Sequence, residues 1–128
     1  TARASNLPKD DCQLRCLDYP EGMLLSTRDQ EEFLVLNGIQ TQSAKTCNLI
    51  GELADLIRLE VDVLRISPQP RYTVEIIETF HACLRNQLPA TDAAVALQAM
   101  MPTGQCNGYW HARAGMDTCT VQEAPCRH

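Results

Sequence analysis

The clearest pattern along the chain lies over residues 44–66, where apolar and charged residues recur at steps of three and four. This spacing puts the apolar residues on one stripe of a helix and the charged residues on the opposite face. Pro68 and Pro70 would end the helix, because proline lacks the backbone N–H that the next turn needs. The pattern therefore predicts an amphipathic helix of about six turns over 44–66. Its apolar stripe would consist of Leu49, Ile50, Leu53, Leu56, Ile57, Val61, Val63 and Leu64.

Three other segments show the signals of helices. Thr27 can cap a helix that opens with acidic residues, buries Phe33 and stops at Gly38. Two more helices are expected over 72–88 and 93–101, and each of them stops just before a proline. With the long helix, these segments make four helices of unequal length.

Residues outside these segments show no sustained period and should be irregular, apart from one short helical turn near residues 12–17. We therefore predict an all-α protein, a compact four-helix bundle formed by a single domain over 1–128. The bundle itself would span 27–101. An N-terminal arm, 1–26, and a loop-rich, cysteine-rich tail, 102–128, would be stapled to it by disulfides.

Composition and charge exclude several classes of protein. A chain of 128 residues that is 45% hydrophobic can bury one core. The net charge is −5 and lysine and arginine do not cluster, so nucleic acid is not an expected partner. No apolar run approaches the roughly eighteen residues of a membrane span, and residues 1–11 lack the apolar stretch of a leader. A soluble, mature chain with no membrane insertion is expected.

Seven cysteines are the unusual feature of the composition. In a short chain, this number favours folding in an oxidising compartment, so the sequence predicts a secreted, extracellular protein with about three disulfides. The sequence leaves the pairing open, and we prefer bridges from the arm and the tail onto Cys47 and Cys83. The odd number allows a disulfide-linked homodimer. The cysteines are Cys12, Cys16, Cys47, Cys83, Cys106, Cys119 and Cys126.

Metal and catalytic chemistry find little support in the sequence. Cys12 and Cys16, with Cys119, Cys126 and His128 from the tail, could offer zinc ligands, but no second short-spaced pair occurs. No serine lies in a Gly-x-Ser-x-Gly turn, and no histidine precedes an aspartate as in the small secreted phospholipases. We therefore predict no catalytic residue, no metal and no cofactor, and a protein that is not an enzyme.

Two groups of residues are candidates for contact with a partner protein. Tyr109, Trp110 and Arg113 lie between two cysteines, and these side-chain types most often anchor interfaces. A lone tryptophan in such a tail can instead pack on a disulfide or cover the core. The second group is the charged face of the long helix, which could steer a receptor or could simply keep the protein soluble. This face comprises Glu52, Asp55, Arg58 and Asp62.

The favoured function is that of a secreted helical ligand, a signal or venom-type effector, that binds a cell-surface or extracellular protein receptor. The expected architecture resembles the short-chain helical cytokines at the level of the fold, and a fold alone does not fix a function. The alternative function is an extracellular carrier of a small apolar molecule, such as a lipid or an odorant. Its cavity would be lined by Met100, Met101 and Met116, because methionine adapts to irregular cavities.

Overall fold

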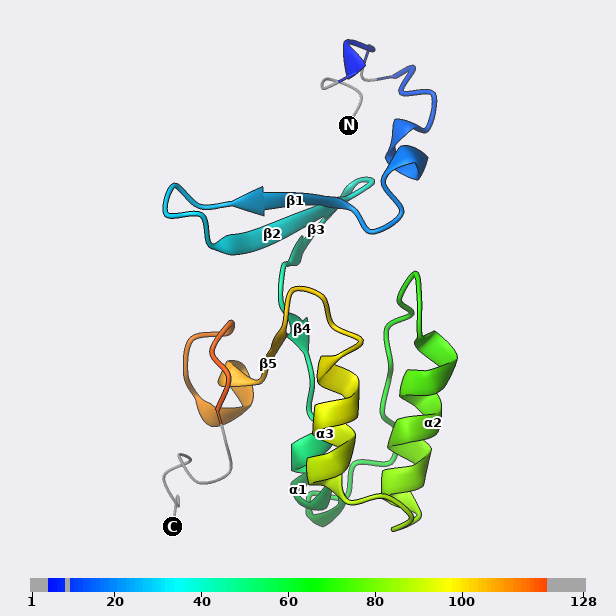
Figure 1. The fold of residues 1–128 in the computed structure, drawn as a ribbon, viewed down its shortest axis with the longest axis vertical. Helices are drawn as coiled ribbons and strands as arrows, with labels where there is room; N and C mark the ends of the chain where they lie inside the picture. The colour runs from blue at the N-terminus through cyan, green and yellow to red at the C-terminus, as the bar shows by residue number, and fades with distance from the viewer. Residues whose placement is uncertain (1–4, 9, 120–128) are drawn as a thin grey trace. The chain divides into compact units, whose positions relative to one another are not determined.

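A computed structural model describes residues 5–8 and 10–119 of the chain. The chain forms two compact units, 1–45 and 46–128. The first unit contains a three-stranded sheet, and the second combines three α-helices with a pair of short strands. The fold is therefore mixed α/β, and the prediction of an all-α four-helix bundle is wrong (Figure 1).

The first unit is built around an antiparallel sheet with the strand order β1-β2-β3. In the middle of the sheet, Val35 lies opposite Leu24 on one side and opposite Gln42 on the other. A short 3-10 helix, η2, precedes the strands and overlaps the short helical turn expected near residues 12–17. The elements of this unit are η2 (Arg15–Asp18), β1 (Met23–Ser26), β2 (Glu32–Asn37) and β3 (Gln40–Ser43).

The helix expected from Thr27 is wrong, because these residues form a turn and a strand. The backbone N–H of Thr27 donates to the carbonyl of Glu31 at 2.8 Å, which closes the turn between β1 and β2. Gly38 opens the two-residue turn between β2 and β3 with a φ of +62°, a conformation that glycine adopts without strain. The apolar run 33–36 is too short for periodicity to distinguish a helix from a strand.

The second unit combines two short parallel strands with its helices. β4 and β5 place Cys47 opposite Cys106. The helices α2 and α3 confirm two predicted helices, although α3 begins earlier than expected, directly after Pro89. The elements are β4 (Thr46–Cys47), η3 (Ile50–Glu52), α1 (Leu53–Arg58), α2 (Thr73–Leu84), α3 (Ala90–Gln98), β5 (Gln105–Cys106) and η4 (Gly108–His111).

The long amphipathic helix is wrong, and only α1 and the short η3 remain of it. Before the helix, the side-chain oxygen of Asn48 accepts a hydrogen bond from the N–H of Ile50 at 3.0 Å, which turns the chain into η3. After the helix, Glu60 adopts a φ of +57°, and the N–H of Val61 bonds back to the carbonyl of Leu56 at 3.1 Å. A left-handed residue at this position ends a helix.

The core of the second unit lies where η3, α1, α2 and α3 meet. At its centre is Leu97 of α3, which exposes 0% of its surface. Cys83 packs against the core from α2, and burial raises the pKa of its thiol, which therefore stays protonated at neutral pH. The core residues are Ile50, Leu53, Leu56, Ile76, Ala93, Leu97 and Met101. Within the part of the chain that is described, no helix combines the length and the apolar character needed to cross a membrane.

Candidate functional site

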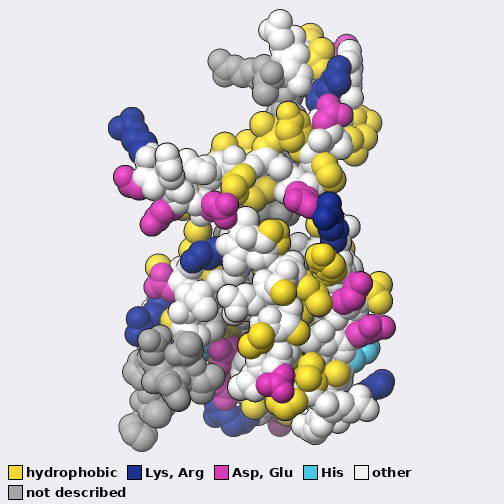
Figure 2. Space-filling view, in the orientation of Figure 1, with side chains coloured by type: hydrophobic (Ala, Val, Ile, Leu, Met, Phe, Trp, Pro, Cys, Tyr) yellow, Lys and Arg dark blue, Asp and Glu magenta, His cyan; other side chains and the backbone are white. Residues whose placement is uncertain are grey.

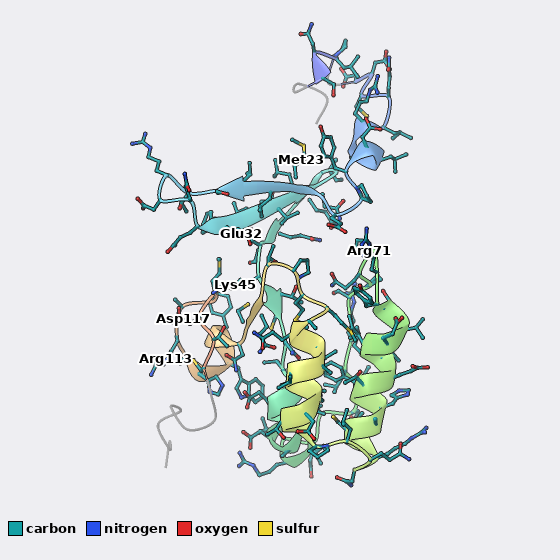
Figure 3. All side chains as sticks on the ribbon, in the orientation of Figure 1. Met23, Glu32, Lys45, Arg71, Arg113 and Asp117 are labelled. Atoms are coloured by element: carbon teal, nitrogen blue, oxygen red, sulfur yellow. The ribbon has the colours of Figure 1, made fainter. Side chains whose placement is uncertain are left out.

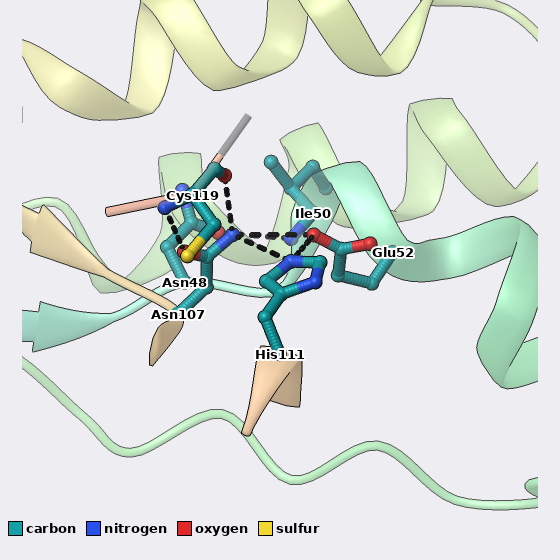
Figure 4. Close-up of polar contacts among 6 residues, drawn as sticks. All are labelled: Asn48, Ile50, Glu52, Asn107, His111 and Cys119. Carbon is teal, nitrogen blue, oxygen red and sulfur yellow. Dashed lines mark hydrogen bonds and ion pairs between the residues drawn. The ribbon is translucent and has the colours of Figure 1, made fainter. Parts of the chain in front are cut away.

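A buried polar cluster connects η3 to the tail of the second unit. The Oε1 atom of Glu52 lies 3.1 Å from Nε2 of His111 and 3.2 Å from Nδ2 of Asn107 (Figure 4). Only 7% of the Glu52 side chain and 9% of the His111 side chain are exposed. Because a carboxylate oxygen only accepts, the bond requires a hydrogen on Nε2 of His111. Glu52 therefore holds this ring nitrogen in the donor state.

Asn107 is the centre of this cluster. Its Oδ1 accepts a hydrogen bond from the backbone N–H of Cys119 at 2.7 Å, and its Nδ2 donates to the carbonyl of Cys119 at 2.9 Å (Figure 4). The backbone N–H groups of Asn107 and Gly108 both donate to the carbonyl of Asp117 at 3.0 Å. The described part of the tail is therefore ordered by hydrogen bonds, where the sequence predicted disulfides.

No disulfide joins any of the six cysteines that the structure describes. Cys47 is exposed in β4, Cys83 is half-buried in α2, and Cys119 is buried within the polar cluster. Cys126 lies outside the described residues. The predicted disulfide stapling is therefore wrong for the described cysteines. Secretion and a covalent homodimer depended on such bridges, and they stay predictions without that support.

A partly open hollow of about 440 Å³ lies beside the polar cluster, with walls from η3, the start of α3, β5 and the tail. Among the described residues that line it, Glu52 is the only acidic one, and none is lysine or arginine. Nearby, Nδ2 of Asn48 donates to Oε1 of Gln105 at 2.8 Å, and Oγ1 of Thr118 donates to the Gln105 carbonyl at 2.7 Å. The apolar part of the wall includes Ile50, Ala90 and Ala94.

The hollow differs from the cavity that a carrier of apolar molecules would need. It is open to solvent on one side and contains a carboxylate, and Met100, Met101 and Met116 do not line it. Nor does it offer a metal site, because the described residues contain no group of three histidine, cysteine, aspartate or glutamate side chains that could hold an ion.

The three residues predicted as anchors in the tail have different positions on and beside η4. Trp110 is half-buried and packs against the core. Tyr109 is 84% exposed, and its ring lies over Gly115, where an added Cβ would come within 2.4 Å of it. Arg113 is exposed and extends from the tail loop (Figure 3). Trp110 therefore supports the core, whereas Tyr109 and Arg113 face the solvent.

The four residues of the predicted charged face do not share one surface. Glu52 is buried in the polar cluster, and Asp62 is exposed after the end of α1. Asp55 and Arg58 form an ion pair at 2.9 Å on α1, and both are too solvated for the pair to add much stability. The long helix that would have aligned these residues does not form.

The sequence reasoning missed the most connected residues of the cluster, Asn107, His111 and Asn48. The Glu52 and Asn107 side chains that bond to each other are 55 positions apart in the chain. The sequence offers only the Asn107-Gly108 pair as a signal, and this dipeptide indicates a turn, not a contact with η3.

Replacing Trp110 and Tyr109 separately by alanine tests their different positions. Trp110→Ala is expected to lower the free energy of unfolding by about 2 kcal/mol, because it removes a large ring from the edge of the core. Tyr109→Ala should change it by less than about 0.5 kcal/mol, because most of that ring is already in water. Urea unfolding followed by circular dichroism measures both. Equal effects of the two substitutions would contradict these positions.

In the first unit, apolar side chains occupy both faces of the sheet. The register places Leu24, Phe33 and Val35 on one face, and Met23, Leu25, Leu34 and Leu36 on the other. None of these residues is buried, and Ala44 is the single buried residue among those described in this unit. Figure 2 shows hydrophobic side chains at the surface over these strands.

Comparisons with known proteins add no further constraint. The chain matches no protein-family model, and no solved structure matches it.

Proposed function

We propose that this chain is a non-enzymatic binding protein that acts by contact with another polypeptide through the sheet of its first unit. The observation that carries the proposal is that β1 and β2 have apolar residues on both faces and yet bury none of them. A run of consecutive apolar residues is the pattern of a strand that is covered on both faces. A three-stranded sheet without such cover lacks the burial that keeps small units folded.

The gain from covering the sheet is large enough to drive association. Leu24, Leu25 and Phe33 remain between 41% and 49% exposed. Full burial of such a side chain contributes about 1.5–3 kcal/mol, so covering what is still exposed on these three is worth roughly 2–4 kcal/mol. Ile39, fully exposed in the turn between β2 and β3, would add to this gain.

The edges of the sheet favour a polypeptide as the partner. β1 and β3 are the outer strands, and β3, Gln40–Ser43, is exposed along its whole length. Neither strand contains a charged residue or a proline, the features that normally prevent another strand from pairing with an edge. A partner can therefore add a strand at the edge and cover an apolar face with its side chains.

The polar cluster of the second unit supports a binding role over a catalytic one. The Nε2 atom of His111 already donates to Glu52 and lies 3.3 Å from Nδ2 of Asn107, so it is not directed at a reacting group. The sequence also predicted protein–protein contact, but through the charged face of the long helix and through the tail. The surface proposed here is the sheet. The receptor and the compartment that the sequence suggested are not part of the proposal.

The test compares the full chain with two double variants. Leu24→Thr with Phe33→Thr removes apolar surface from the sheet, and Val74→Thr with Val95→Thr makes the same kind of change at exposed positions of α2 and α3. Sedimentation velocity over a concentration series measures self-association, and amide hydrogen exchange at low concentration measures the protection of β1–β3.

The expected result is reversible self-association of the wild type that the sheet variant loses and the helix variant keeps. A monomeric wild type with fast-exchanging sheet amides would also support the proposal, and would show that the covering polypeptide is not a second copy. A monomeric wild type whose sheet amides are as protected as those of α2 and α3 would overturn it, because the sheet would then need no partner.

A further inference from the structure

We infer that the hollow beside Glu52 binds the ammonium group of a primary alkylamine. This site lies in the second unit and is independent of the sheet. The hollow has a volume of about 440 Å³, which suits a small organic molecule. Its wall contains the carboxylate of Glu52, which is 7% exposed, and no lysine or arginine is among the described residues that line it.

The charge of the hollow comes from Glu52. Its Oε1 atom accepts from His111 and Asn107, whereas Oε2 takes part in neither bond. The neutral tautomer of His111 with its hydrogen on Nε2 is sufficient for the first bond, and this bond leaves Oε2 of the carboxylate to another donor. A largely buried carboxylate is most stable beside a cation. Among the described residues of the wall, no lysine or arginine takes that place, which leaves it to a ligand.

Other groups in the wall add hydrogen-bond acceptors and an apolar surface. The Oγ1 atom of Thr118 gives its hydrogen to the carbonyl of Gln105, so towards a ligand it can only accept. Ile50, Ala90 and Ala94 supply methyl and methylene groups. A primary ammonium donates three hydrogen bonds, and an alkyl stem of a few carbons fits the apolar part.

The same features exclude other classes of ligand. Among the described residues, an anion would meet the Glu52 carboxylate with no lysine or arginine in the wall, and a divalent metal would lack a set of three ligands. The alkylammonium group itself has two sources, a free small amine or the lysine side chain of a polypeptide, and the experiment distinguishes them.

The test is a titration of the ¹⁵N-labelled full chain with n-butylamine at about pH 8. The amide signals of Gly51 and Gln105, which lie in the wall, report binding, and n-butanol is the uncharged probe of the same shape. Glu52→Gln removes the charge and keeps an oxygen that accepts from Asn107. Asp55→Asn, on α1 and outside the hollow, is the matched control.

We expect n-butylamine to give saturable shifts. The affinity should be unchanged in Asp55→Asn and at least tenfold weaker in Glu52→Gln. n-Butanol should give no saturable shift. Ala90→Leu, which fills the hollow and leaves Glu52 intact, should also abolish binding and serves if Glu52→Gln does not fold. Nα-acetyl-lysine methylamide binding more tightly than n-butylamine would identify a polypeptide lysine as the source, and the reverse order a free amine. No saturable shift in the folded wild type, or equal affinity in Glu52→Gln, would overturn the proposal.

Discussion

Leu97→Ala is expected to lower the free energy of unfolding of the second unit by about 3 kcal/mol. Leu97 exposes 0% of its surface and lies on α3 among core residues from η3, α1 and α2. Alanine would remove most of the side chain and leave a cavity that three separate elements would have to close. Such a cavity adds to the lost transfer free energy, because surrounding elements relax only in part.

Urea unfolding followed by the fluorescence of Trp110, the only tryptophan, measures this loss. Val95→Ala is the matched control, because Val95 lies two residues away on the same helix and is 71% exposed. We expect the control to change the free energy by less than about 0.5 kcal/mol. If the two substitutions lowered the free energy of unfolding by similar amounts, Leu97 would not be buried in a core.

Asn107→Ala should lower the free energy of unfolding of the second unit by about 3 kcal/mol and release the tail from η3. The amide of Asn107 satisfies the backbone N–H and C=O of Cys119 and one oxygen of Glu52. Alanine satisfies none of them, and a buried polar group left without a partner costs about 1–3 kcal/mol. Part of this cost will be relieved as water reaches the freed groups.

Amide exchange identifies the origin of this loss. In Asn107→Ala, the N–H of Cys119 should exchange much faster than in the wild type. The amides of α2 should rank in the same order of exchange protection as they do in the wild type. Gln98→Ala, which removes an exposed amide from the end of α3, is the control and should leave both unchanged. An Asn107→Ala protein in which the Cys119 amide stays protected would show that the tail is held by other contacts.

The sequence predicted the helices with clear boundaries and missed the rest of the fold. α2 and α3 are flanked by prolines and carry a regular apolar stripe, so local signals were sufficient. The long helix failed because its stripe continued past Glu60, where a left-handed backbone conformation ends α1. The spacing of apolar residues does not indicate where a residue other than glycine will adopt a left-handed conformation.

The strands and the polar cluster depend on contacts between distant parts of the chain. Four consecutive apolar residues in β2 fit a helix as well as a strand, and only the pairing with β1 and β3 decides. β4 pairs with β5 across more than fifty residues, and the same is true of the bond between Glu52 and Asn107. The cysteine count suggested covalent cross-links, but the described tail is instead ordered by hydrogen bonds, among them two between the Asn107 side chain and the Cys119 backbone.

The most direct test of the claim that the sheet lacks its own cover is urea unfolding followed at two places in one dilute sample. Trp110 fluorescence reports the second unit, and the methyl NMR signals of Val35 report the centre of the sheet. We expect the dispersed Val35 signals to be lost at a clearly lower urea concentration than the Trp110 transition. A single transition with the same midpoint at both places would contradict the account, because the sheet would then be as well supported as the helical core.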